Sequence, residues 1–189
     1  EPALAAIAAS HCLVQRSKPL VLAGVQALLQ GRPVSLPAFH SREISAYVAR
    51  TLAERPITAI YVFSGQMGQF VPADFKGRVI ADLVDVDSAK FHGGLRGLIE
   101  AREGRLLRIE EARIAERADL CLLVSRPEAD LLVQRLDPAS RARVEALSNG
   151  IDSHAFAPLE VQPEPALIAQ DAPRLIFSGQ MDYAPNIAA

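Results

Sequence analysis

The sequence contains few of the residues that build disulfide or zinc frameworks, and it has no excess of charge of either sign. Its 189 residues include no Trp, two Cys and two Met, with 20 Lys and Arg against 22 Asp and Glu. Cys12 and Cys121 are too few and too far apart for a disulfide framework or a zinc site, which favours a reducing compartment. The balanced charge gives no basic footprint for duplex DNA or RNA, so we expect no nucleic-acid partner.

Long apolar runs are also lacking, since no stretch approaches the roughly 20 residues that a membrane-spanning helix needs. Half of the residues are nevertheless hydrophobic, which is ample for a buried core and excludes a disordered chain. The sequence has no initiator Met and no signal-peptide pattern, and it stops where a new helix is expected. We therefore expect a fragment of a longer, cytoplasmic protein.

Short apolar segments alternate with helical patterns along the first 150 residues. The apolar segments are rich in aliphatic and β-branched residues and too short for helices, which predicts strands at residues 57–63, 78–84, 119–124 and 143–147. Apolar residues at helical spacing predict helices at residues 19–30, 41–54, 95–118 and 125–135. Continuous apolar strands separated by helices indicate an α/β fold with a doubly wound parallel sheet, covered on both faces.

The predicted helix at residues 19–30 is apolar, ends at Gly31, and is flanked by Arg16, Lys18 and Arg32. It is either a core-facing helix with solvated ends or a helix that docks on an anionic membrane surface. The stretch at 33–39 follows as a connector broken by proline.

Beyond residue 150 the composition changes. Residues 151–172 are polar and interrupted by proline, which predicts an interdomain linker. Residues 173–189 are then expected to begin a second domain with a strand and a loop. The pentapeptide FSGQM occurs at 63–67 and again at 177–181, which is too short to establish a repeat.

The carboxyl ends of parallel strands are where ligands bind in such sheets. Asp85 and Asp87 follow a buried strand there and are the most pointed feature of the sequence. They fit a pair of ligands for Mn²⁺ or Mg²⁺ on a nucleotide diphosphate, or carboxylates that hold a hydroxylated substrate. The pair also resembles the first motif of haloacid-dehalogenase-type phosphatases, but the acidic motif required downstream is lacking. The structural alternative is that one Asp caps the next turn.

Other polar residues have simpler interpretations. His92, in a glycine-rich loop, is a surface residue or a catalytic one. Ser125 is expected to cap a helix, and Asn149-Gly150 to form a tight turn with positive φ. The charged residues expected on a solvated helix face are Arg105, Arg108, Glu110 and Glu111.

The order of several segments resembles retaining, nucleotide-sugar-dependent glycosyltransferases of the GT-B fold, which has two Rossmann-like domains. These segments are ADLCLLVSRPEADLL, RVEALSNGIDSHAFAP and APRLIFSGQM. A closer similarity, to sugar transferases associated with exopolysaccharide and exosortase systems, lies in DLVDVDSAKF, REGRLLRIEEARIAERAD and FSGQMDYAPN. The resemblance covers roughly residues 40–189.

The resemblance implies that residues 1–150 are an acceptor-side Rossmann-like domain without its first strands, and that 173–189 begin the donor-binding domain. It also implies transfer of a sugar from a nucleotide-sugar to a polysaccharide or lipid-linked acceptor in exopolysaccharide synthesis, without a further cofactor. Such a protein would act in the cytoplasm or at the inner face of the plasma membrane. The competing hypothesis is a non-catalytic Rossmann-type binding module.

The resemblance also implies roles for individual residues. Asp85 and Asp87 are expected to be catalytic, in a loop where many relatives carry a His. Gly179 and Gln180 are expected to donate backbone N–H groups to the donor phosphates, although this loop lacks the usual Arg and Lys. Residues expected to contact substrate are Ser64, Gly65, Gln66, Ser88, His92, Ser125 and Asn149. No resident metal is expected.

Overall fold

The computed structural model describes residues 2–91 and 97–157, together with residues 159, 162, 164, 165 and 179. The chain divides into two compact units, Glu1–Asn149 and Gly150–Ala189. The predicted linker begins with residues 151–157, which form neither helix nor strand. The predicted strand and loop at 173–189 lie outside the described residues except for Gly179, so the second domain stays a prediction.

The first unit contains a four-stranded parallel sheet in the order β1-β2-β3-β4. Its strands are β1 (Ala59–Phe63), β2 (Arg78–Val84), β3 (Leu120–Leu123) and β4 (Val144–Ala146). Each lies within a predicted strand, so the α/β class and the parallel sheet are confirmed. A doubly wound sheet reverses its strand order, and the described strands show no reversal. That finer topology therefore stays a prediction.

Helices connect the strands and precede them. They are α1 (Pro2–Ile7), α2 (Leu20–Gln30), α3 (Ser35–Phe39), α4 (Arg42–Glu54), α5 (Gly97–Arg117) and α6 (Arg126–Arg135). Two 3₁₀ helices, η1 (Gly65–Phe70) and η2 (Asp87–Lys90), follow β1 and β2. Among the described residues, no helix has both the length and the apolar character that crossing a membrane requires.

Local sequence signals account for several helix boundaries. The hydroxyl oxygen of Ser41 accepts a hydrogen bond from the Ile44 N–H at the start of α4, and α2 ends at Gly31 with φ 64°. The expectation of an irregular connector at 33–39 was wrong, because α3 forms there. Pro37 is the third residue of α3, within the first turn, where a helix does not need the N–H that proline lacks.

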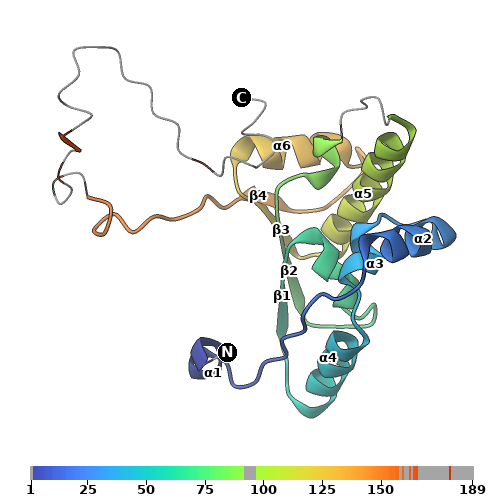
Figure 1. Ribbon diagram of the computed structural model, residues 1–189, viewed down its shortest axis with the longest axis horizontal. Coiled ribbons are helices and arrows are strands. Elements are labelled where there is room, and N and C mark those ends of the chain that lie inside the picture. Colours follow the sequence, from blue (N-terminus) through green and yellow to red (C-terminus); the bar gives the residue numbers. More distant parts are fainter. Residues whose placement is uncertain are drawn as a thin grey trace. The chain divides into compact units, whose positions relative to one another are not determined.

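The core lies between one face of the sheet and the helices. Val79, Ala81 and Leu83 alternate along β2 and are buried against Ile114 of α5 and Leu132 of α6. Figure 1 shows α2, α3, α4 and α5 on the same side of the sheet.

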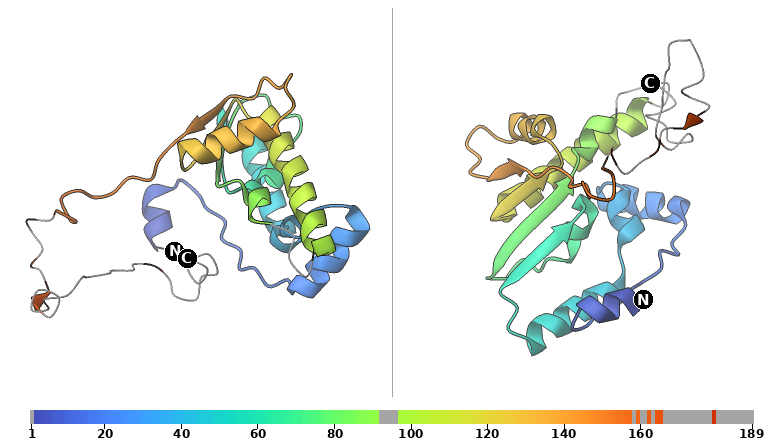
Figure 2. Two further views of the ribbon diagram at one scale, coloured as in Figure 1. Left: turned by 90° about the horizontal axis from the view of Figure 1, so that it is seen from above. Right: turned by 90° about the vertical axis from the view of Figure 1, so that its left-hand side faces the viewer.

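The opposite face of the sheet is open at β1. The Tyr61 and Phe63 side chains are 55% and 62% exposed, whereas Val62 between them is buried. The right-hand view of Figure 2 looks onto this face, with the strands in front of the helices. The expectation that both faces are covered was therefore wrong at β1. A short apolar run alone does not show whether one face or both will be buried.

Candidate functional site

The parallel sheet brings the loops after β1, β2 and β3 to one edge. The backbone N–H of Ser64, after β1, donates to the Asp82 carbonyl oxygen at 2.7 Å. The Val124 N–H, after β3, donates to the Val84 carbonyl oxygen, also at 2.7 Å. Ser64, the loop that begins at Val84 and the start of α6 are therefore neighbours, as the sequence predicts for strand ends in a parallel sheet.

The backbone at the end of β2 turns sharply at Val84. Val84 has φ 69°, and the Asp85 N–H donates to the Leu83 carbonyl oxygen at 2.9 Å, which together describe a γ-turn. This left-handed conformation is strained for a β-branched residue. The register between β2 and β3 also shifts between Asp82 and Val84. The turn changes the direction of the chain where β2 ends.

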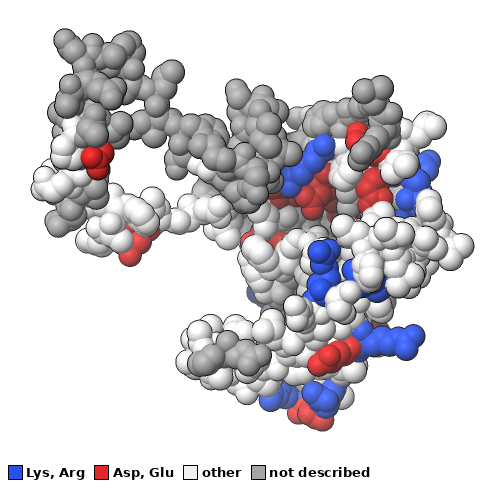
Figure 3. Space-filling view, in the orientation of Figure 1, with Lys and Arg blue, Asp and Glu red and all other residues white. Residues whose placement is uncertain are grey.

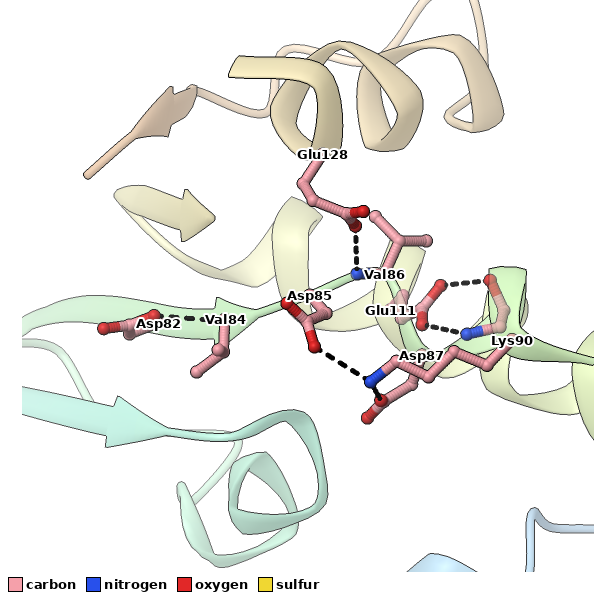
Figure 4. Close-up of polar contacts among 9 residues, drawn as sticks. Asp82, Val84, Asp85, Val86, Asp87, Lys90, Glu111 and Glu128 are labelled. Carbon is pink, nitrogen blue, oxygen red and sulfur yellow. Dashed lines mark hydrogen bonds and ion pairs between the residues drawn. The ribbon is translucent and has the colours of Figure 1, made fainter. Parts of the chain in front are cut away.

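Asp82 supports this turn, a role that the sequence pattern did not lead us to expect. Its Oδ1 accepts a hydrogen bond from the Val84 N–H at 3.1 Å (Figure 4). Its Oδ2 accepts one from the Tyr61 hydroxyl at 2.5 Å. The bond to the carboxylate is the main cause that raises the pKa of Tyr61. A carboxylate inside an otherwise apolar strand was the signal that could have revealed this role.

Asp85 and Asp87 lie together after the turn, and both contact Lys90. The Lys90 ammonium is 2.9 Å from Asp85 Oδ2 and 2.7 Å from Asp87 Oδ1, and all three side chains are partly exposed (Figure 4). Partial burial opposes the charge on Lys90, but hydrogen bonds to Asp87 and Asp85 outweigh it and raise the pKa of Lys90. Lys90 therefore remains a cation at neutral pH and balances part of the negative charge.

Glu111 of α5 holds the next part of the loop after β2, at Ser88. It is only 5% exposed and accepts hydrogen bonds from the Ser88 N–H at 2.8 Å and the Ser88 hydroxyl at 2.6 Å. Burial raises the pKa of Glu111, while these hydrogen bonds partly oppose the shift. The expectation that Glu111 lies on a solvated face was wrong. Helical periodicity could not show that one charged position would point at the loop after β2.

Glu128 of α6 completes the support of the loop. Its Oε2 accepts a hydrogen bond from the Val86 N–H at 2.7 Å. The backbone N–H groups of Val84, Val86 and Ser88 are thus held by three carboxylates, one each from β2, α6 and α5. A loop braced in this way can present the Asp85 and Asp87 carboxylates to hydroxyl groups without rearrangement.

Two of the residues expected to contact substrate have structural partners instead. The Ser88 side chain is buried, and besides its bond to Glu111 its hydroxyl accepts a hydrogen bond from Arg135 Nη1 at 2.6 Å. The Ser125 hydroxyl accepts from the Glu128 N–H at 3.4 Å, which confirms the predicted helix cap. By contrast, Ser64, Gly65 and Gln66 are partly exposed at the edge of the sheet. Ser64 also has positive φ, at 72°.

The remaining predicted site residues lie at the end of the first unit or beyond it. Asn149 is exposed after β4, but neither it nor Gly150 has positive φ, so the predicted tight turn was wrong. The chain passes from one compact unit to the other at this point instead of reversing direction. Gly179 is exposed, while His92 and Gln180 lie outside the described residues.

An apolar groove of about 690 Å³ lies beside this edge, between α4, β1 and η1, and its lining includes Tyr47, Phe63 and Met67. In residues 2–91 and 97–157, no group of three or more His, Cys, Asp or Glu residues is placed to hold a metal ion. No protein-family model, curated protein or solved structure matches the chain.

Proposed function

We propose that this chain is part of a retaining, nucleotide-sugar-dependent glycosyltransferase of the GT-B fold. In this proposal the unit Glu1–Asn149 is the acceptor-side domain, and the second unit begins the donor-binding domain. The acceptor is a polysaccharide or a lipid-linked sugar in exopolysaccharide synthesis. The order of the sequence motifs supports the family. One structural observation carries the site: two carboxylates on a braced loop at the carboxyl end of β2.

The chemistry makes particular demands on such a loop. Retaining glycosyl transfer passes through an oxocarbenium-like state, so the departing diphosphate must be stabilised while an acceptor hydroxyl is held on the same face of the sugar. Asp85 and Asp87 can accept hydrogen bonds from sugar hydroxyls, and Ser64 and Gln66 can contribute further polar contacts from the loop after β1. Stabilisation of the diphosphate is assigned to the second unit.

The bracing of the loop supports a positioning role for Asp85 and Asp87. An acceptor hydroxyl must be placed to within a fraction of an ångström for transfer to be efficient, and a freely moving loop would lose this advantage. Lys90 fixes both carboxylates in one geometry. Each carboxylate has a second oxygen atom that can accept a hydrogen bond from a sugar hydroxyl.

The proposal is tested with the full-length protein and a panel of nucleotide sugars. We expect turnover with at least one donor, and a fall in kcat/KM of about a hundredfold for Asp85→Asn and for Asp87→Asn. Asp130→Asn is the matched control, because Asp130 is an exposed partner of Arg126 on α6. A folded protein that turns over none of the donors would refute the proposal. Wild-type activity in both Asn variants would remove the catalytic role of the loop.

A non-catalytic binding module is the second candidate. It is favoured by the contact of both carboxylates with Lys90, which leaves less free negative charge at the site. Calorimetry distinguishes the two functions: this candidate predicts binding of a nucleotide sugar without turnover, unchanged in Asp85→Asn and Asp87→Asn. Measuring turnover with and without EDTA tests the metal-dependent alternative, which predicts complete loss of activity on chelation.

A further inference from the structure

The helix α2 presents its large apolar side chains to solvent. Those exposed by 49% to 83% are Leu20, Val21, Leu22, Val25, Leu28 and Leu29. With about 3.6 residues per turn, the last five cover an arc of roughly 120° on the helix. Only the small side chains of Ala23 and Ala27 are buried. The expectation of a core-facing helix was therefore wrong for every large apolar residue of α2.

This exposed helix is firmly attached to the first unit. Ala23 and Ala27 are completely buried, and Arg102 of α5 donates a hydrogen bond to the Ala27 carbonyl oxygen at 3.0 Å. Just before α2, the Lys18 ammonium donates to the Pro37 carbonyl oxygen at 2.6 Å and to Gln26 Oε1 at 3.1 Å. The apolar arc is thus a fixed ridge and not a loosely attached segment.

The surroundings of α2 carry positive charge. The helix itself has no charged residue, and residues 2–42 contain Arg16, Lys18, Arg32 and Arg42 but no Asp or Glu. The neighbouring carboxylate of Glu103 is turned inward, where it accepts a hydrogen bond from the Val34 N–H and lies 3.7 Å from Arg102. Figure 3 shows an uncharged surface at α2, with Lys and Arg side chains beside it and acidic side chains above it.

A small polar pocket adjoins the ridge on the side of these basic residues. It has a volume of about 110 Å³ and is lined by Lys18, Gln26, Gln30, Arg32, Pro37, His40 and Gln69. Two cationic groups and the amides of Gln26 and Gln30 suit an anion such as a phosphate group, whereas Gln69 donates its amide N–H groups to the Leu36 and Gln66 carbonyl oxygens. Two of the three donors of the Lys18 ammonium are used within the protein, which leaves one for such an anion.

We propose that α2 docks the protein on an anionic phospholipid surface. Leu and Val side chains of the ridge enter the acyl boundary, and the pocket of Lys18 and Arg32 receives a lipid phosphate group. The ridge is aliphatic, whereas the residues that dominate binding energy at protein interfaces are enriched in Trp, Tyr and Arg, which favours lipid over a protein partner. A second copy of this face would bring like charges together. The proposal does not depend on the transferase activity.

Vesicle flotation of the full chain tests the proposal. The vesicles contain either phosphatidylcholine alone or phosphatidylcholine with about a third of phosphatidylglycerol. We expect binding to the anionic vesicles, reduced at least about tenfold in Leu28→Gln/Leu29→Gln. Arg32→Gln is expected to weaken binding about fivefold on anionic vesicles and to leave binding to neutral vesicles unchanged.

Two matched variants control for general surface changes. Val133→Gln removes an apolar side chain that is 53% exposed on α6, and Arg126→Gln removes an exposed cation from the same helix. Both are expected to bind as the wild type does, and circular dichroism checks that all variants are folded. Absence of flotation with anionic vesicles, or equal flotation of Leu28→Gln/Leu29→Gln, would overturn the proposal. A wild-type dimer that this variant converts to a monomer would assign the ridge to a second copy instead.

Discussion

At the scale of single residues, the candidate site depends on carboxylates that are not expected to touch substrate. Asp82, Glu111 and Glu128 each accept a hydrogen bond from a backbone N–H of the loop after β2. Val86 lies between β2 and η2, and Ser88 is in the first turn of η2, where an N–H has no partner within the helix, so these N–H groups need such partners. Loss of one carboxylate would leave a donor unpaired at a cost of about 1–3 kcal/mol where the site is buried.

Replacing Glu111 with Gln tests the effect of the buried charge. Because burial raises the pKa of Glu111 above its ordinary value of 4.5, the folded state binds its proton more tightly than the unfolded state does. We expect the stability of the wild type relative to Glu111→Gln to be greatest below pH 4.5 and to fall as the pH rises through the raised pKa. Urea unfolding of both proteins across this range measures the difference. A difference that does not vary with pH would contradict the assignment.

Ser64 allows strain to be separated from function. At φ 72° a non-glycine residue is strained, so Ser64→Gly is expected to raise the free energy of unfolding by about 1 kcal/mol. Ser64→Ala retains the strain and should change stability by less than about 0.5 kcal/mol. Both variants lack the hydroxyl. If Ser64 contacts the acceptor, both lower kcat/KM equally, whereas a fall in one variant alone would argue against the contact.

At the scale of secondary structure, α5 joins the parts of the first unit. Its Glu103 accepts a hydrogen bond from the Val34 N–H at 2.5 Å, and its Glu111 holds Ser88. Its Ile114 lies against Gly68 of η1, where a Cβ atom would be only 2.9 Å from Ile114 Cδ1. One long helix thus links the segment before α3, the loop after β1 and the loop after β2. Its charged residues are divided between solvent and these buried contacts.

The turn before β2 needs a glycine. A Cβ atom at Gly77 would overlap the Thr58 carbonyl oxygen and the Phe75 ring, and the backbone oxygen cannot move aside easily. Gly77→Ala is therefore expected to lower the free energy of unfolding by about 1–3 kcal/mol. Gly24→Ala is the control, since a Cβ atom there would have no neighbour within 4 Å and alanine favours a helix. Chemical denaturation should show opposite signs for the two, and equal stability of Gly77→Ala and wild type would refute the overlap.

At the scale of the whole molecule, the first unit has an open side. In the described sheet, β1 lies at the edge and exposes Tyr61 and Phe63. This edge borders the apolar groove between α4, β1 and η1. The carboxyl edge of the sheet carries the braced acidic loop, and α2 carries the proposed membrane ridge. The features that we associate with substrate and with lipid thus belong to different elements of one unit, so mutations can separate them.

Hydrogen exchange can establish whether the edge of β1 is free in solution. Along β1, every second residue, Ser64 among them, donates its backbone N–H to β2. The N–H groups of Tyr61 and Phe63, which alternate with these residues, therefore point away from β2. We expect the amides of Tyr61 and Phe63 to exchange much faster than those of Val62 and Ser64. Similar protection along all of β1 would show instead that another segment pairs with this edge.

The sequence by itself determined the features that depend on neighbours along the chain. The apolar runs predicted the strands, Ser41 and Ser125 marked helix starts, and Gly31 marked the end of α2. The parallel arrangement also followed, because strands separated by helices must run the same way. That arrangement was enough to predict that Asp85 and Ser64 lie at the same edge of the sheet.

Tertiary structure alone decided which side of each element meets the protein and which meets solvent. Periodicity predicts that α2 is apolar and that α5 is charged, but not that α2 would expose its leucines or that Glu111 would be buried. The turn at Val84 likewise depends on Asp82 and on pairing with β3, distant in sequence. Such contacts join residues far apart along the chain, and their energies override local preferences.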